Sequence, residues 1–144
     1  MEDASLRAVA RRWMNLHEAN RRPSFDQEFE ALHAFDFQDH SPTGRAADRE
    51  AFKQGLVEWY GAFPDLDVQV EDLVVDAEQG KVTIRWSAVG THRAAFLGAA
   101  ATGRQVHFRG IEILTIARGV VVERWGEWDG IDLLAQLGVR TPSP

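Results

Sequence analysis

Apolar residues recur at three- and four-residue spacing through the first half of the chain, a pattern that predicts amphipathic helices. We expect one helix over residues 5–20, a second after Ser24, which suits an N-cap, and a third over residues 47–62. The segment 35–44 lacks this periodicity and is typical of an extended piece that ends in a turn. The apolar stripes of the three helices consist of Leu6, Val9, Trp13 and Leu16, then Phe25, Phe29 and Leu32, then Phe52, Leu56, Trp59 and Phe63.

From residue 66 onward the apolar positions alternate with a period of two, which predicts β-strands. Asp129 suits the N-cap of a short final helix over residues 131–137. The predicted strands cover residues 66–70, 81–89, 104–116 and 120–128. Helices that precede an antiparallel meander indicate an α+β domain, in which three N-terminal helices cover one face of a curved sheet.

Length, charge and cysteine content limit the number of domains, the partners and the chemistry that we expect. The 144 residues suit a single domain, with an ordered core expected over about residues 5–138. A net charge of -6 argues against nucleic acid as a partner. No apolar stretch approaches the roughly 18 to 20 residues of a membrane-spanning helix, and the acidic N-terminus is unlike a signal peptide. Cysteine is absent, which excludes disulfides and thiol chemistry. We therefore expect a cytoplasmic protein without a membrane partner.

The chain is rich in aromatic residues, with eight Phe and five Trp. If the covered face of the sheet is concave, these side chains would line a core large enough to hold a small apolar molecule, although each of them can equally be plain core packing. The residues that we expect to contact such a ligand are Trp13, Phe37, Trp59, Trp86, Phe108, Gly110, Gly126 and Trp128.

The last two strands form a hairpin whose register can be predicted from its loop. A three-residue loop over residues 117–119 places Glu112 opposite Arg124 and Gly110 opposite Gly126. Two opposed glycines leave a gap between side chains, and beside an opposite-charge pair this gap would suit the floor of a ligand cavity. The alternative is a bend in the sheet beside an ordinary cross-strand ion pair. A two-residue loop would shift the register by one residue, and these residue pairs would then no longer lie opposite each other.

The order of several motifs along the chain resembles the SnoaL-like polyketide cyclase family, from about Leu6 to Gly138. This resemblance implies the cone-shaped α+β fold of the nuclear transport factor 2-like superfamily, which also includes ketosteroid isomerase, scytalone dehydratase and limonene epoxide hydrolase. The motifs are Phe63-Pro64-Asp65-Leu66, Val70-Glu71-Asp72-Leu73-Val74, Gly90-Thr91-His92, Phe96-Leu97-Gly98, Thr102-Gly103-Arg104, Gly110-Ile111-Glu112-Ile113 and Gln136-Leu137-Gly138.

The resemblance implies aldol cyclisation without metal or organic cofactor, with a pocket carboxylate as general acid and base. The aspartate of characterised cyclases falls on Gly126 here. We expect Glu112 to replace it, with Arg124 keeping Glu112 ionised and therefore suited to act as a base. The second candidate is the pair Asp39 and His40, because the extended segment supplies a polar pocket residue in these families; His40 can equally be an exposed turn residue.

Three functions remain open at this point. The first is a cyclase or isomerase acting on a small apolar carbonyl compound through Glu112 and His40. The second is hydrolysis of an epoxide by paired acidic and basic groups. The third is non-catalytic binding of a small hydrophobic molecule, which Gly126 favours over the first. The resemblance also implies a homodimer formed through the outer face of the sheet, where Ile111, Ile113 and Trp125 would make an apolar strip.

Overall fold

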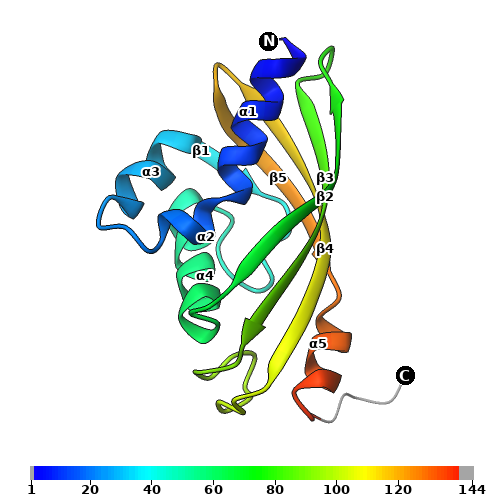
Figure 1. The fold of residues 1–144 in the computed structure, drawn as a ribbon. Helices are drawn as coiled ribbons and strands as arrows, with labels where there is room; N and C mark the ends of the chain where they lie inside the picture. The colour runs from blue at the N-terminus through cyan, green and yellow to red at the C-terminus, as the bar shows by residue number, and fades with distance from the viewer. Residues whose placement is uncertain (1, 140–144) are drawn as a thin grey trace.

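The computed structural model describes residues 2–139 and confirms the α+β fold: helices lie on one side of a curved, unclosed sheet (Figure 1). The elements are α1 (Asp3–Met14), α2 (Leu16–Ala19), α3 (Phe25–Leu32), β1 (His33–Asp39), α4 (Arg49–Ala62), β2 (Asp67–Asp76), β3 (Lys81–Thr91), β4 (Gln105–Ala117), β5 (Val120–Trp128) and α5 (Gly130–Gln136). None of the described helices is long and apolar enough to cross a membrane.

The sheet has the strand order β1-β5-β4-β3-β2. Strands β2 to β5 form the antiparallel meander that the alternating pattern predicts. The extended segment of the first half becomes the edge strand β1, which pairs in parallel with β5 and brings Asp39 beside Arg124. Helices α1 to α4 lie along one face of the sheet, whereas α5 follows β5 and lies beside the lower part of β4 (Figure 1).

The helices differ from the predicted ones in two respects. The first predicted helix is interrupted at Asn15, so that α1 and α2 replace one continuous helix. Ser24 directly precedes α3 as predicted, but its side chain makes no capping hydrogen bond, because the hydroxyl donates to the Glu28 carboxylate at 2.8 Å. Two other caps use carboxylates: Asp48 accepts from the Ala51 N–H at the start of α4, and Asp129 accepts from the Asp132 N–H, as predicted for α5.

The predicted register of the β4–β5 hairpin is wrong. The loop has two residues, Arg118 and Gly119, with φ of 51° and 79°, and Ala117 pairs with Val120. Two successive positive φ angles are typical of a type I′ turn, which matches the twist of the strands. As a result Glu112 lies opposite Gly126, and Gly110 lies opposite Trp128.

The predicted faces of β4 and of residues 123–128 of β5 are nevertheless correct. A shift of one residue would turn every inward side chain outward. A β-bulge between Thr115 and Ile116 leaves Val122 without a partner on β4 and shifts the register by one residue more. The turn and the bulge together shift the register by two residues, so Glu112, Arg124 and Gly126 all remain on the inner face of the sheet.

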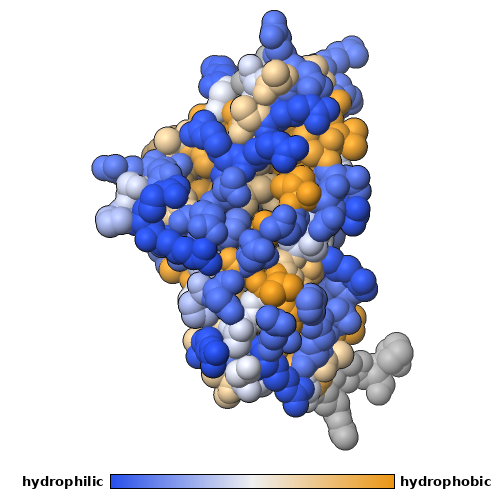
Figure 2. All heavy atoms as spheres, viewed as in Figure 1, coloured by the Kyte–Doolittle hydropathy of each residue, from blue (hydrophilic) through white to orange (hydrophobic). Residues whose placement is uncertain are grey.

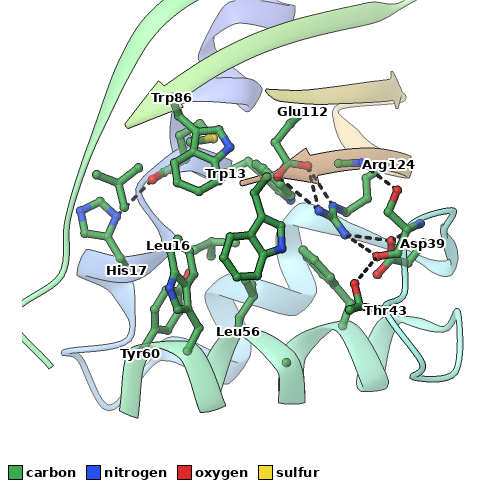
Figure 3. Close-up of a pocket in the computed structure, with 18 of the residues that line it drawn as sticks. Trp13, Leu16, His17, Asp39, Thr43, Leu56, Tyr60, Trp86, Glu112 and Arg124 are labelled. Atoms are coloured by element: carbon green, nitrogen blue, oxygen red, sulfur yellow. Dashed lines mark hydrogen bonds and ion pairs between the residues drawn. The ribbon is translucent and has the colours of Figure 1, made fainter. Parts of the chain in front are cut away.

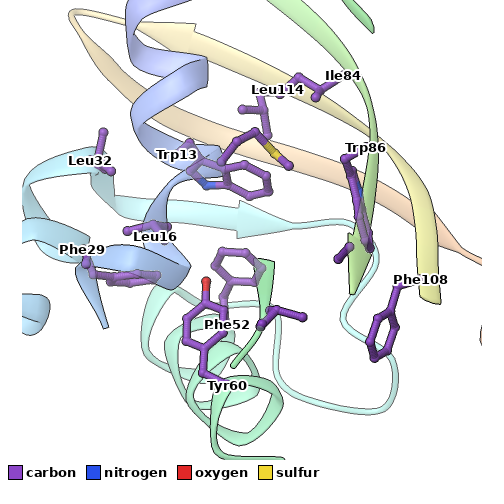
Figure 4. Close-up of a cluster of buried hydrophobic side chains, with 14 of the residues drawn as sticks. Trp13, Leu16, Phe29, Leu32, Phe52, Tyr60, Ile84, Trp86, Phe108 and Leu114 are labelled. Atoms are coloured by element: carbon purple, nitrogen blue, oxygen red, sulfur yellow. The ribbon is translucent and has the colours of Figure 1, made fainter. Parts of the chain in front are cut away.

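The helices bury their apolar stripes against the inner face of the sheet (Figure 4). Trp13 of α1 stacks on Phe52 of α4, with ring centroids 5.9 Å apart, and Phe29 stacks on His33 at 4.1 Å. Each fully buried aromatic side chain contributes about 1.5–3 kcal/mol through the removal of apolar surface from water. In the view of Figure 2 the molecular surface is mostly hydrophilic, with hydrophobic groups showing between the charged ones.

Candidate functional site

A cavity of about 150 Å³ lies between the helices and the inner face of the sheet, and it is partly open to solvent. One ordered water needs about 10–15 Å³ by this measure, so the cavity has room for a small organic molecule. Its walls are mainly aromatic and aliphatic, with a few polar groups, as is usual for ligand sites. The apolar walls include Trp13, Met14, Leu16, Phe52, Leu56, Trp59, Val68, Trp86, Phe96 and Trp128.

Arg124 lies at the charged end of the cavity and is shared by two carboxylates (Figure 3). Its Nε donates to Glu112 Oε2 at 3.1 Å and its Nη2 to Oε1 at 3.2 Å, which is a two-point contact. Its Nη1 donates to Asp39 Oδ1 at 2.9 Å. All three side chains are about nine-tenths buried or more. One buried cation therefore faces two buried acidic groups.

Three elements position this network. Glu112 comes from β4 and Arg124 from β5, on the face that looks toward the helices. Asp39 ends β1, where the parallel pairing with β5 sets it beside Arg124. The segment after β1 is tied down because the Ser41 N–H donates to Asp39 Oδ1 at 2.9 Å, and the Gly126 N–H donates to Ser41 Oγ at 3.0 Å.

Position 126 has room only for glycine. A Cβ atom there would overlap Arg124 Nη2 and Glu112 Oε2 and would lie 2.8 Å from Arg124 Cζ. Because Arg124 is two residues before Gly126 and Glu112 is directly opposite, both side chains converge on this strand position. Glycine at position 126 is thus a requirement of the Glu112–Arg124 ion pair.

Burial dominates the ionisation of Glu112. It raises the pKa of this carboxyl to about 7, and the negative charge of Asp39 acts in the same direction. The Arg124 cation lowers the pKa of Glu112, as we expect from the sequence, but it is outweighed. The pKa of Glu112 therefore lies above its ordinary value, in spite of the neighbouring cation that we expect from the sequence to keep it ionised.

Trp86 places a free hydrogen-bond donor beside Glu112. Its indole ring lies over Gly110, where a Cβ atom would be only 2.6 Å from Cζ2. Trp86 Nε1 is buried and makes no hydrogen bond within the described chain. In Figure 3 the indole nitrogen is turned toward Glu112, and Trp86 lowers the pKa of this carboxyl. A buried N–H without a partner costs about 1–3 kcal/mol, a penalty that a ligand acceptor would remove.

Two polar residues that sequence reasoning missed, His17 and Tyr60, line the cavity away from Arg124. His17 Nδ1 lies 3.1 Å from the Met14 carbonyl, and burial lowers the pKa of His17. Burial raises the pKa of Tyr60, so that its hydroxyl stays protonated. The only sequence signal for Tyr60 is its position on α4, four residues after Leu56 on the predicted apolar stripe.

The structure brings together only some of the predicted site residues. Glu112, Asp39 and Arg124 meet in the cavity, but His40 points to the outer face of the sheet. There its Nε2 pairs with Glu123 at 2.9 Å and its ring stacks on Trp125 at 4.2 Å.

Among the predicted ligand contacts, five line the cavity and three lie behind it. Phe37 packs on Phe52 with centroids 5.3 Å apart, Phe108 packs on Phe63 at 4.7 Å, and Gly110 is covered by Trp86. The five that line it are Trp13, Trp59, Trp86, Gly126 and Trp128. Over residues 2–139, no group of three His, Asp or Glu side chains is arranged to hold a metal ion.

Comparison with known proteins gives a consistent result. The family model described as SnoaL-like polyketide cyclase matches residues 8–137. TsrD from Streptomyces laurentii superposes with a TM-score of 0.83 at 21% identity, covering 97% of this chain and 99% of TsrD. AclR from Streptomyces galilaeus, a candidate hydroxylase, gives 0.78 at 23% identity, covering 95% and 98%.

IdmH from Streptomyces antibioticus, a candidate polyketide cyclase, superposes with a TM-score of 0.73 at 28% identity, covering 91% of this chain and 99% of IdmH. No curated protein sequence matches the chain. At these identities, TsrD and AclR indicate a shared fold only.

Proposed function

Because the chain belongs to the SnoaL-like polyketide cyclase family, we propose that its cavity binds a small, largely apolar carbonyl compound and that Glu112 moves a proton during cyclisation or isomerisation. The observation that carries this proposal is the position of Glu112: a buried carboxyl with a pKa of about 7 at the charged end of a mainly apolar cavity. An acid–base group works best when its pKa lies near the working pH.

The proposed reaction requires one group that both takes and returns a proton. The Glu112 carboxylate removes a proton from the carbon beside the carbonyl, and the C–H electrons pass into an enolate. The enolate carbon bonds to a second carbonyl carbon in the same molecule, whose oxygen becomes an alkoxide. This alkoxide then takes the proton from Glu112, which restores the carboxylate.

Trp86 and Arg124 support this step in different ways. The free Trp86 N–H can donate to the substrate oxygen while negative charge develops on it. Arg124 holds Glu112 through two hydrogen bonds and so fixes the direction of the carboxylate. We assign no chemical role to His40, whose side chain lies on the outer face.

The test is hydrogen–deuterium exchange at the carbon next to a ketone, measured by NMR in D₂O. We expect exchange above the buffer rate for at least one ketone of a panel that includes 2-tetralone. Glu112→Gln should lower this rate about 100-fold or more, the usual contribution of a general base. Glu123→Gln is the matched control, because Glu123 is on the same hairpin but pairs with His40 outside the cavity. Equal rates in wild type and Glu112→Gln would refute the role of Glu112.

Epoxide hydrolysis is the second candidate, because Arg124 lies between two carboxylates in the cavity. In this reaction one carboxylate would take a proton from water while the guanidinium stabilises the opening ring oxygen. Incubation with styrene oxide in ¹⁸O-labelled water distinguishes this activity, since the diol product would carry the label.

Non-catalytic binding is the remaining alternative. Quenching of tryptophan fluorescence by 2-tetralone, without any exchange or hydrolysis in wild type, would support it and would count against both enzymatic proposals.

A further inference from the structure

Arg45 is one of the residues that line the cavity. It follows a tight turn in which Thr43 and Gly44 both have positive φ, 53° and 83°, and the Arg45 N–H donates to the Pro42 carbonyl. The guanidinium lies against α4 at Gly55: a Cβ at that position would be 2.8 Å from Cζ and 2.9 Å from both Nε and Nη1. Gly55 thus leaves space for Arg45.

Glycine at this position has a cost. Gly55 is in the interior of α4, with helix on both sides. Glycine in a helix interior is less stable than alanine by about 0.5–1 kcal/mol. Gly55 is therefore an unfavourable residue for the helix at the position where the Arg45 guanidinium packs against it.

The contacts that Arg45 makes with other side chains do not explain why its guanidinium packs against Gly55. Within residues 2–139 its side chain makes one ionic contact, from Nη2 to Glu58 Oε2 at 3.5 Å, and both side chains are exposed to solvent. Exposed ion pairs contribute only about 0–1 kcal/mol. Arg124, the other arginine of the cavity, is already bound to Glu112 and Asp39. Arg45 is thus the arginine of the cavity lining that retains unused donors.

From these observations we infer that Arg45 binds a carboxylate of the ligand, so that the substrate of this chain is an apolar carbonyl compound that also carries an ionised carboxyl group. The planar guanidinium fork matches a carboxylate in two parallel hydrogen bonds. The apolar part would lie among Trp13, Leu56 and Trp59. This inference rests on the proposal that the cavity is a ligand site, but it does not depend on proton transfer by Glu112.

The test measures binding instead of turnover. The probes are aryl carboxylates of increasing length, namely benzoate, phenylacetate and 2-naphthoate, each paired with its neutral amide. Tryptophan fluorescence reports binding, because Trp13, Trp59, Trp86 and Trp128 line the cavity. We expect wild type to bind at least one carboxylate about tenfold more tightly than its amide, a difference of about 1.4 kcal/mol.

Two variants test the assignment to Arg45. Arg45→Gln should reduce the carboxylate preference to about one. Gly55→Ala keeps every charge but displaces the guanidinium, so it should also reduce the preference, while α4 becomes more stable. Arg118→Gln, in the distant hairpin turn, is the control and should retain the preference.

Three results would overturn the inference. The first is the absence of carboxylate preference, or of any binding, across the whole panel in wild type. The second is a preference that survives in Arg45→Gln. The third is a preference that only Arg124→Gln removes, which would assign the anion to Arg124. Ketone exchange by Glu112 is measured separately, so either proposal can fail without the other.

Discussion

Gly126 lies directly opposite Glu112 on the neighbouring strand, and the Glu112–Arg124 ion pair fills the space that a side chain at position 126 would need. The resemblance to the cyclases leads us to expect an aspartate at position 126, and under the proposed function Glu112 provides the carboxylate from the opposite strand.

This relationship predicts that Gly126→Ala is destabilising. The new methyl group forces Arg124 and Glu112 apart, and separating a buried ion pair costs about 3–5 kcal/mol. Urea unfolding monitored by fluorescence measures the loss. The control is Gly61→Ala in α4, where a Cβ would meet nothing within 4 Å; it should be neutral or slightly stabilising. Similar stabilities for the two variants would contradict the packing described at Gly126.

Arg124→Met should leave Glu112 and Asp39 buried without a cation. We expect a loss of about 3–5 kcal/mol at pH 8. The loss should be smaller at pH 5, because protonation of Glu112 removes one of the two uncompensated charges. Unfolding curves at both pH values test this, with Arg118→Met at the exposed turn as the control. A loss that does not depend on pH would argue that Arg124 acts by packing on Phe52 instead.

The raised pKa of Glu112 predicts a pH dependence of stability. Between about pH 4.5 and about pH 7 the folded protein holds a proton on Glu112 that the unfolded chain releases. The folded state thus binds more protons, and this contribution to the free energy of unfolding falls as the pH rises through that window.

The contribution of Glu112 must be measured as a difference between proteins. Burial lowers the pKa of His33 to about 4, and this histidine stays neutral while it accepts from Trp13 Nε1. Between about pH 4 and 6.5 its contribution to stability rises with pH, opposite in sign to that of Glu112. Unfolding at pH 5 and pH 7.5 should therefore show a more positive change with pH in Glu112→Gln than in wild type. Identical slopes would contradict the raised pKa.

Trp86→Phe should reduce the rate of the proposed ketone exchange while the shape of the cavity wall changes little. The variant keeps an aromatic ring over Gly110 but removes the N–H that has no protein partner. We expect kcat for ketone exchange to fall about 100-fold, as when one donor to a developing oxyanion is removed. Trp59→Phe, on the same wall, is the control. Equal effects of the two substitutions would indicate that Trp86 acts only through packing.

Dimer formation stays a prediction that solution experiments can test. Ile111 and Ile113 are 49% and 36% exposed on the outer face of the sheet. If two copies pair through this face, Ile111→Arg should convert a dimer into a monomer in light scattering at micromolar concentration. A monomer in wild type would reject the prediction. Trp125 is partly covered by His40 and Lys81, so it contributes less free apolar surface than its position in the sequence suggests.

The fold class, the order of strands β2 to β5 after the helices and the inward positions of Glu112, Arg124 and Gly126 could be predicted from the sequence. Each depends on apolar periodicity or on caps such as Asp129, which involve residues close together in the chain. Even the inward face of Glu112 survived a wrong register, because the turn and the bulge together shifted the strand by an even number of residues.

The site itself was decided by the tertiary structure. Arg124 meets Asp39 across 85 positions of sequence, because β1 pairs in parallel with β5, and no local pattern specifies that pairing. The same pairing turns His40 to the outer face, one residue after Asp39 turns inward. Burial, which exists only after the helices pack, gives Glu112 its raised pKa. The sequence therefore determined which groups were available, and the packing of distant segments decided which of them meet and how they ionise.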